Sequence, residues 1–120
     1  MSGLGKEIYK LYEGGRMEKS IVQNLEDMME FPKAGIFSKV LVRTDISNHT
    51  LMCLAKGTEM SEHTSTREAA VTVLKGKGVF TLYGKKIKMK PGVFIFMPKN
   101  APHSLSADEN LAILLSLSGK

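Results

Sequence analysis

The chain has 120 residues, of which 42% are hydrophobic and 24% are charged. This length fits one domain, since domains average roughly 150 residues, and the composition is that of a globular protein rather than of a disordered or membrane-spanning chain. Cys53 is the only cysteine, which excludes an intramolecular disulfide and a cysteine-rich zinc module.

The net charge of +5 comes mainly from lysine, with only three arginines among the 17 basic residues. A basic chain raises nucleic acid as a partner, but nucleic-acid interfaces favour arginine forks and aromatic stacking, and tryptophan is absent. Residues 1–10 lack the apolar core of a signal peptide, and residues 111–117, the longest apolar stretch, are too short to cross a bilayer. We therefore expect a cytoplasmic protein without membrane contact.

Helical signals are confined to the N-terminal part of the chain. Residues 6–13 can form a short helical turn, which two glycines then end. Asn24 can cap a second short helix, with Asp27 three residues later. This helix must end by Phe31, because the residue before a proline is excluded from the helical backbone region.

From residue 36 onward, short apolar runs alternate with glycine, proline and asparagine, as in all-β domains. The predicted strands are residues 37–43, 49–55, 69–74, 79–83, 86–90, 93–97 and 111–117. Seven or eight short strands predict an all-β sandwich or barrel. We expect a single-domain protein in which residues 1–35 form an N-terminal arm and residues 36–118 form the barrel.

Two of the predicted strands, residues 93–97 and 111–117, are apolar on both faces. A strand with one face in solvent would alternate apolar and polar side chains. The outer face of this sheet must therefore be covered, either by the N-terminal arm or by a second subunit. We expect a homodimer, with residues 1–35 packed on the barrel or on the partner.

The segment from residue 57 to residue 76 contains a histidine between two glycines. Gly57 is followed after five residues by His63, and Gly76 closes the segment. These intervals resemble the first motif of the cupin superfamily, which has a glycine, two histidines, a glutamate and a second glycine. Ser65 stands at the second histidine position and Ala69 at the glutamate position, so one of three ligands is kept.

A second segment, residues 92–107, resembles the second cupin motif. Gly92, Pro98 and His103 match it, whereas Asn100 replaces a glycine and Ala107 replaces an asparagine. Asparagine tolerates the left-handed backbone of a turn glycine. The chain thus resembles a small, cupin 2-like protein with a degenerate metal motif. The resemblance implies a double-stranded β-helix, or jelly-roll-like, barrel preceded by a short helical segment.

The resemblance also implies that this chain lacks two of the four ligands of a cupin metal site. Metal-binding cupins hold iron, manganese, nickel or zinc with three histidines and one carboxylate, and only His63 and His103 remain here. Two imidazoles give little affinity or selectivity, so we expect a metal-free site, with a divalent transition metal on His63 and His103 as the alternative. Glu62 and Glu68 each lie one residue from a ligand position and should face the other side of their strand. The eight methionines are scattered, which indicates core filling rather than a soft copper site.

His63 and His103 are expected at strand ends, at the mouth of the barrel. The predicted ligand pocket consists of His63, Ser65, Ala69, Val71 and His103, with apolar walls and few polar anchors. Serine and alanine are smaller than the ligands they replace, which predicts additional room beside them. The imidazoles could act as general acid and base, or they could simply be hydrogen-bonded to neighbouring hydroxyls or to the backbone.

Three functions from different classes remain open. The first is a small-molecule-binding cupin that is non-catalytic or weakly catalytic. The second is a metal-dependent cupin enzyme of the dioxygenase or isomerase type, and the third is a basic, nucleic-acid-associated β-barrel. The cupin fold carries many activities, so the fold by itself does not choose among them.

Overall fold

The computed structural model describes residues 20–119, and the helical turn predicted over residues 6–13 lies outside that range. The described chain forms one short helix, α2 (Leu25–Met28), and nine strands. The strands are β1 (Ile36–Arg43), β2 (Ser47–Leu54), β3 (Glu59–His63), β4 (Glu68–Lys75), β5 (Gly78–Leu82), β6 (Lys85–Met89), β7 (Phe94–Met97), β8 (His103–Ala107) and β9 (Leu111–Ser118). The prediction of an all-β barrel with a short helix before Phe31 is confirmed.

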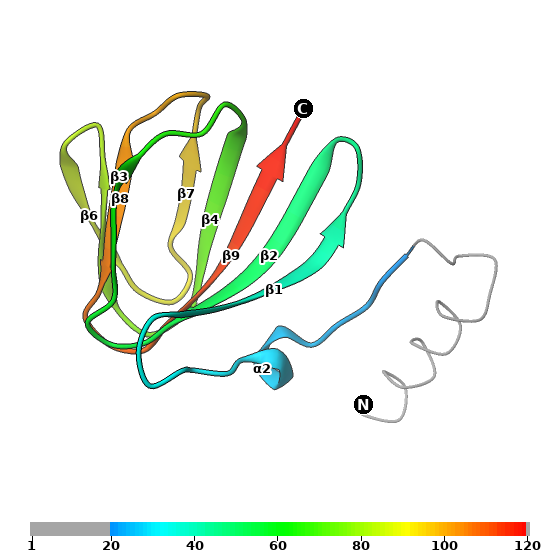
Figure 1. Ribbon diagram of the computed structural model, residues 1–120, viewed down its shortest axis with the longest axis horizontal. Coiled ribbons are helices and arrows are strands. Elements are labelled where there is room, and N and C mark those ends of the chain that lie inside the picture. The colour runs from blue at the N-terminus through cyan, green and yellow to red at the C-terminus, as the bar shows by residue number, and fades with distance from the viewer. Residues whose placement is uncertain (1–19, 120) are drawn as a thin grey trace.

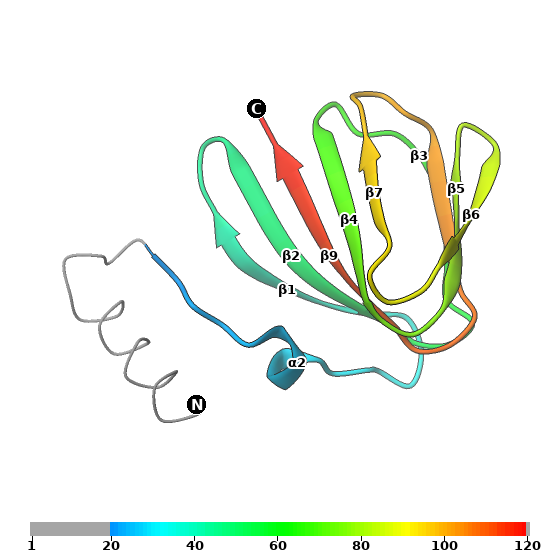
Figure 2. The same cartoon turned by 180° about the vertical axis from the view of Figure 1, so that it is seen from behind.

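Two antiparallel sheets face each other (Figures 1 and 2). One has five strands in the order β1-β2-β9-β4-β7, and the other has four in the order β3-β8-β5-β6. Apart from the hairpins β1–β2 and β5–β6, each strand is followed by one in the opposite sheet. This repeated crossing gives the expected jelly-roll arrangement, and it inserts the C-terminal strand β9 between β2 and β4.

All seven predicted strands are present, but β3 and β8 are additional. Both are short and mostly polar, and the side chains that they turn toward the core are few, chiefly Met60 and Leu105. A short strand whose outer face is polar gives little hydrophobic signal, so the sequence pattern indicated loops there. The two additional strands carry His63 and His103 at their ends.

Local residue chemistry fixes the chain reversals. Asn24 caps α2, because its Oδ1 accepts a hydrogen bond from the Glu26 backbone N–H at 3.0 Å. Tyr83 and Gly84 both have positive φ and form the predicted tight hairpin between β5 and β6. Asn100 has a φ of 65°, the left-handed conformation expected where it replaces a turn glycine.

The main hydrophobic core lies between the inner faces of the two sheets. Its fully buried side chains include Leu54, Val71, Val73, Phe80, Met89, Leu111 and Ile113. No polar or charged residue of the described chain is buried. Within residues 20–119, no helix is long and apolar enough to span a membrane.

A second, smaller core lies on the outer face of the five-stranded sheet. Its buried members are Leu51, Cys53 and Ala112. The side chains that cover them are Met28, Met29, Phe31, Phe37, Leu41 and Leu74. Strand β9 therefore packs on both faces around Ala112, which accounts for its apolar run from Leu111 to Leu115. Burial raises the pKa of the Cys53 thiol, with smaller contributions from Glu30, as expected for a structural cysteine.

Two glycines with the same backbone conformation provide a test of the fold. Gly76 has a φ of 87°, and a Cβ there would overlap the carbonyl oxygen of Asn110, whereas Gly57 has a φ of 88° and open space around it. We predict that Gly57→Ala lowers the free energy of unfolding by about 1 kcal/mol, the cost of a left-handed backbone. Gly76→Ala should lower it by about 3 kcal/mol, because backbone must also shift. Urea unfolding of both variants measures the difference, and equal losses would contradict the close approach at Gly76.

Candidate functional site

The antiparallel pairing of β3 with β8 places His63 directly opposite His103. The register of β3 shifts between Met60 and His63, and bulges of this kind re-aim side chains beside functional sites. The two imidazole centroids lie 4.2 Å apart, with an interplanar angle of 62°. Histidines from the two separate sequence motifs therefore form one side-chain pair.

Both histidines use the same ring nitrogen to bind the backbone. Nδ1 of His63 lies 2.8 Å from the carbonyl oxygen of Ser61, and Nδ1 of His103 lies 2.8 Å from that of Ala101. A carbonyl oxygen only accepts, so Nδ1 carries the proton in each bond. In the neutral ring, Nε2 then keeps its lone pair. The backbone bonds considered from the sequence are present, and they leave one nitrogen of each ring to bind something else.

The histidine pair lines a cavity of about 50 Å³ between the two sheets. The lining residues are Met52, Met60, His63, Val71, Phe80, Met97, His103, Ser104, Leu105, Ile113 and Leu115. Phe80 stacks on the His103 ring with a centroid separation of 5.8 Å and an interplanar angle of 4°, which restricts the orientation of that imidazole. A cavity of about 10–15 Å³ is enough to hold one water molecule, so this cavity has room for a few waters or a small ligand group.

The structure places three of the five predicted pocket residues in the wall of this cavity. His63, Val71 and His103 line it, whereas Ser65 and Ala69 do not. Ala69 is buried within the main core on β4. The additional room expected beside Ser65 and Ala69 is therefore not part of this cavity.

Ser65 connects two loops instead of lining the cavity. Its Oγ accepts a hydrogen bond from the Arg67 backbone N–H at 3.1 Å. Its carbonyl oxygen accepts another from the Asn100 backbone N–H at 2.7 Å. Ser65 thus joins the loop that follows β3 to the loop that precedes β8, and these are the strands that carry the histidine pair.

Sequence reasoning missed most of the cavity wall. Met52, Met60, Phe80 and Met97 lie on β2, β3, β5 and β7 respectively. The alternation within β7, where Ile95 and Met97 are buried, is a signal that Met97 points inward. No spacing in the sequence indicates that residues of four different strands meet at one point.

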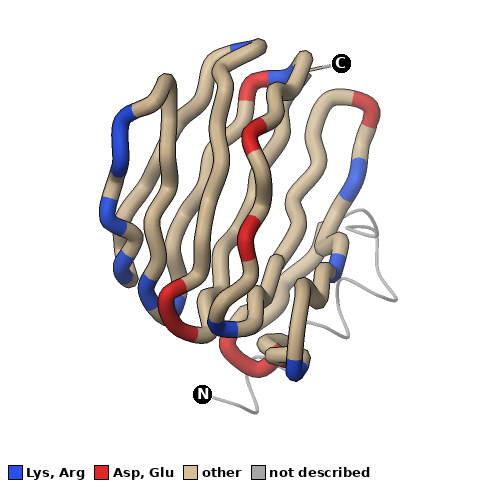
Figure 3. Tube along the Cα trace, turned by 60° about the vertical axis from the view of Figure 1, so that its left-hand side comes forward, with Lys and Arg blue, Asp and Glu red and all other residues tan. Residues whose placement is uncertain are grey.

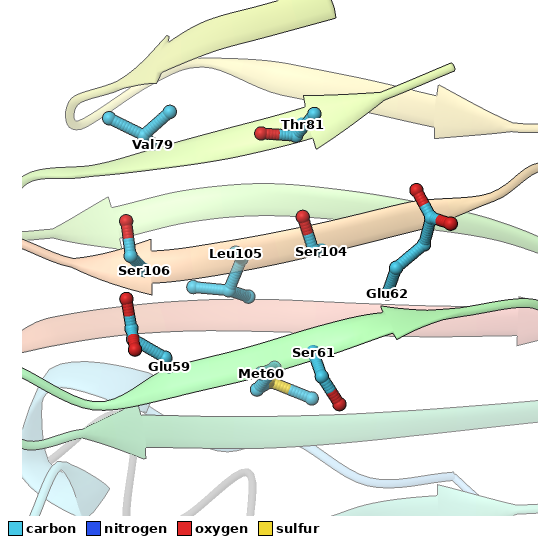
Figure 4. Close-up of a pocket in the computed structure, with 9 residues that line it drawn as sticks. All are labelled: Glu59, Met60, Ser61, Glu62, Val79, Thr81, Ser104, Leu105 and Ser106. Carbon is cyan, nitrogen blue, oxygen red and sulfur yellow. The ribbon is translucent and has the colours of Figure 1, made fainter. Parts of the chain in front are cut away.

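The donor atoms at this site do not fit the three-histidine, one-carboxylate set of metal-binding cupins. Only two imidazoles are present, and Ser65 and Ala69 stand where the other ligands would be expected. Over residues 20–119, no group of three or more His, Cys, Asp or Glu side chains is placed to hold a metal ion. Glu62 faces the outer side of the sheet, away from the cavity (Figure 4).

That outer face carries an open groove of about 500 Å³ (Figure 4). The lining residues are Glu59, Met60, Ser61, Glu62, Val79, Thr81, Ser104, Leu105 and Ser106. The carboxylates of Glu59 and Glu62 lie along β3, and the neighbouring strands β8 and β5 carry hydroxyl side chains. The lysines of β6 follow, with Lys86 opposite Thr81 and Lys88 opposite Val79. Acidic and basic side chains therefore share this face of the molecule (Figure 3).

Comparison with known proteins decides the family. Residues 50–117 match the Cupin domain family. The chain belongs to the cupin family. The predicted membership is confirmed, and the five-plus-four strand arrangement is the barrel of a small cupin.

Two solved structures share this cupin barrel at appreciable sequence identity. A conserved protein of unknown function from Streptococcus pyogenes is 29% identical, with a TM-score of 0.76 over 84% of this chain and 89% of that chain. A cupin 2 conserved barrel domain protein from Leptotrichia buccalis is 35% identical, with a TM-score of 0.75 over 80% of this chain and 47% of that chain.

Among curated proteins, an uncharacterized protein of Aquifex aeolicus is 37% identical over 62 residues. The match covers 52% of this chain and 51% of that protein. The cupin thus matches about half the length of this curated relative.

We predict that His63 and His103 are both Nδ1–H tautomers when neutral, because each Nδ1 faces a backbone carbonyl. Long-range ¹H–¹⁵N NMR correlation on labelled protein reports which nitrogen carries the proton. His49 is the internal comparison, since its Nδ1 lies 2.9 Å from the Ser116 hydroxyl, which can donate or accept. The variants His49→Gln and His103→Gln each remove one set of signals and so assign all three histidines. An Nε2–H tautomer at His63 or His103 would show that its Nδ1 does not donate to the backbone carbonyl.

Proposed function

We propose that this cupin binds a small molecule at the His63–His103 pair. The observation that supports this most directly is that both rings line one partly open cavity while backbone carbonyls face their Nδ1 atoms. Two neighbouring Nε2 acceptors suit a ligand that carries two adjacent O–H or N–H donors. The mostly apolar walls leave the two imidazoles as the main polar anchors for such a ligand.

The dimensions of the cavity limit the part of the ligand that it encloses. A volume of about 50 Å³ accommodates a small polar head group rather than a whole metabolite. His63 is exposed, whereas His103 is half-buried, so the remainder of the ligand would extend past His63 toward solvent. Recognition would then depend on the histidine pair inside and on the barrel mouth outside.

The other two hypotheses have less support. A metal-dependent cupin enzyme would need a third histidine and a carboxylate, and neither lines the cavity beside the histidine pair. For a nucleic-acid partner, the lysines of β6 would be the footprint, but Glu59 and Glu62 lie on the same face of the molecule (Figure 3). The phosphate groups of a nucleic acid bound across this face would be repelled by these carboxylates.

Small probes with adjacent donors test the proposed function. We predict that urea or a 1,2-diol shifts the NMR signals of His63, His103 and Phe80 in a saturable way. The variant His103→Gln should weaken binding about tenfold, because it removes one hydrogen bond worth about 1.4 kcal/mol. His49→Gln is the matched control and should bind normally. The proposal would be overturned if the unmodified chain shows no saturable shifts, or if His103→Gln binds the probes with unchanged affinity.

We further propose a second copy of this chain as a partner, seated on the outer face of the five-stranded sheet. There, β7 turns Phe94 and Phe96 into solvent, with 64% and 51% of each residue exposed. Their neighbours on β4, Thr72 and Ala70, are too small to cover the two rings. The side chains that cover the rest of this face pack on Leu51, Cys53 and Ala112, so the uncovered aromatic end continues an apolar surface that is already packed.

Removing the two aromatic rings tests this partner. We predict that the double variant Phe94→Ser, Phe96→Ser weakens self-association about 100-fold, because central aromatic side chains dominate interface energies. Light scattering at micromolar concentration should show a dimer for the unmodified chain and a monomer for the double variant. Ile46→Ser is the control, since Ile46 is 65% exposed on a different part of the surface. A monomeric unmodified chain would contradict the proposal.

A further inference from the structure

A separate groove of about 420 Å³ lies at the end of the four-stranded sheet that is far from the histidine pair. We call it the lysine groove, because its charged lining residues are Lys77, Lys88, Lys90 and Asp108. None of its lining residues lines the histidine cavity. On β5, Leu82 is opposite His103 and Gly78 is opposite Ala107, so four residues, or about 13 Å of strand, separate the two sites.

The strand register brings the three lysines together. Gly78 is opposite Met89, so Lys77 and Lys90, the next residues outward on the two chains of this hairpin, also lie side by side. Met89 is buried, and Lys88 and Lys90 on either side of it therefore both point to the outer face. Like charges at opposite positions of neighbouring strands destabilise a sheet. The free groove thus carries a repulsion that a bound anion would relieve.

Asp108 is the carboxylate that lines the same groove. The backbone N–H groups of Asp108 and Glu109 both donate to the carbonyl oxygen of Lys77, at 3.0 and 3.1 Å, which holds the turn after β8 against the start of β5. Three lysines and one aspartate give the lining a formal net charge of +2. A phosphate monoester carries between about 1.5 and 2 negative charges at neutral pH, so its charge complements that of the groove.

Protection of an exposed sheet edge is the competing explanation for the lysines of this hairpin, which follow one edge of the molecule (Figure 3). It accounts for Lys86, Lys88 and Lys90, because β6 is the edge strand of its sheet. It does not account for Lys77, which leads into β5, an inner strand between β8 and β6. Lys77 shares the groove with Lys88 and Lys90, whereas Lys86 lies outside it.

We propose that the lysine groove binds a small, soluble molecule that carries a phosphate monoester group. The ammonium groups of Lys77, Lys88 and Lys90 donate charge-assisted hydrogen bonds to the phosphate oxygens. A volume of about 420 Å³ also leaves room for an organic part, since ligand pockets commonly measure about 300–1,000 Å³. This site shares no residue with the histidine cavity, so the inference is independent of the proposed function.

The acidic side of the sheet limits the size of the anion. Glu59, Ser106, Val79 and Lys88 form one row of paired residues across β3, β8, β5 and β6. Three strand spacings, or about 14 Å, therefore separate Glu59 from Lys88 along the sheet. This exceeds the Debye length of about 8 Å at physiological salt. A single phosphate group at the lysines is screened from Glu59, whereas a polyanion laid across the sheet would contact it.

The experiment is an NMR titration of the uniformly ¹⁵N-labelled full chain with phenyl phosphate, at an ionic strength held constant with sodium chloride. We expect saturable shifts of the backbone amide signals of Lys77, Lys88 and Lys90. The double variant Lys77→Gln, Lys90→Gln should weaken binding about tenfold, because two of the three exposed ion pairs are lost. The single variant Lys77→Gln replaces it if thermal unfolding shows that the double variant does not fold.

The matched control is the double variant Lys85→Gln, Lys86→Gln. It removes the same charge from the same edge strand, but neither residue lines the groove. This control should bind phenyl phosphate within about twofold of the unmodified chain, because more distant charges are screened. The absence of saturable shifts, or an equal loss of affinity in the two double variants, would overturn the inference. Shifts confined to His63 and His103 would place the phosphate in the histidine cavity and would also overturn it.

Two further probes distinguish a small soluble ligand from a polyanion or a lipid headgroup. We expect vesicles that contain phosphatidic acid not to pellet the protein, and capture by these vesicles would overturn the assignment to a soluble ligand. A single-stranded DNA oligonucleotide should bind no more tightly than phenyl phosphate. Tight oligonucleotide binding that both double variants weaken equally would identify the whole lysine edge as a polyanion surface and would contradict a site confined to the groove.

Discussion

The register between β3 and β8 determines that the two histidines of this cupin meet. Antiparallel pairing puts His63 opposite His103, and the backbone carbonyls two residues before each histidine take the Nδ1 protons. A slip of one residue would turn one imidazole to the outer groove. Ser65 helps to hold this register, because its carbonyl oxygen accepts the Asn100 N–H and so joins the loops at the two strand ends. A position that has lost its ligand character thus still supports the remaining histidines.

The five-stranded sheet has a different constraint, since it is buried on both faces over part of its width. The main core packs on its inner face, and residues from Met28 to Phe31 cover Leu51, Cys53 and Ala112 on its outer face. The four-stranded sheet packs on one face only and carries carboxylates, hydroxyls and lysines on the other. The two sheets therefore divide the roles: one supplies apolar surface for packing, and the other supplies the histidine pair.

The positions where cupins usually carry the other metal ligands do not line the cavity of this chain. Ser65 and Ala69 lie outside the cavity, and methionines from β2, β3 and β7 form its wall. The backbone carbonyls that face both Nδ1 atoms leave Nε2 of each imidazole open. Glu59 and Glu62 line the outer groove instead, and no carboxylate forms part of the cavity wall.

The sequence by itself determined the fold class, seven of the nine strands and the short helix capped by Asn24, because turn residues and hydrophobic patterns are local signals. The spacing of the two motifs also predicted that His63 and His103 converge. It did not determine β3 and β8, whose outward polar side chains hide their strand character, and it placed Ser65 and Ala69 in a pocket whose wall they do not form. Only the tertiary structure decided that Met52, Met60 and Met97 meet the histidines. Side chains on different strands become neighbours because of the strand order and the register within two sheets. The residue pattern of a single strand determines neither the strand order nor the register.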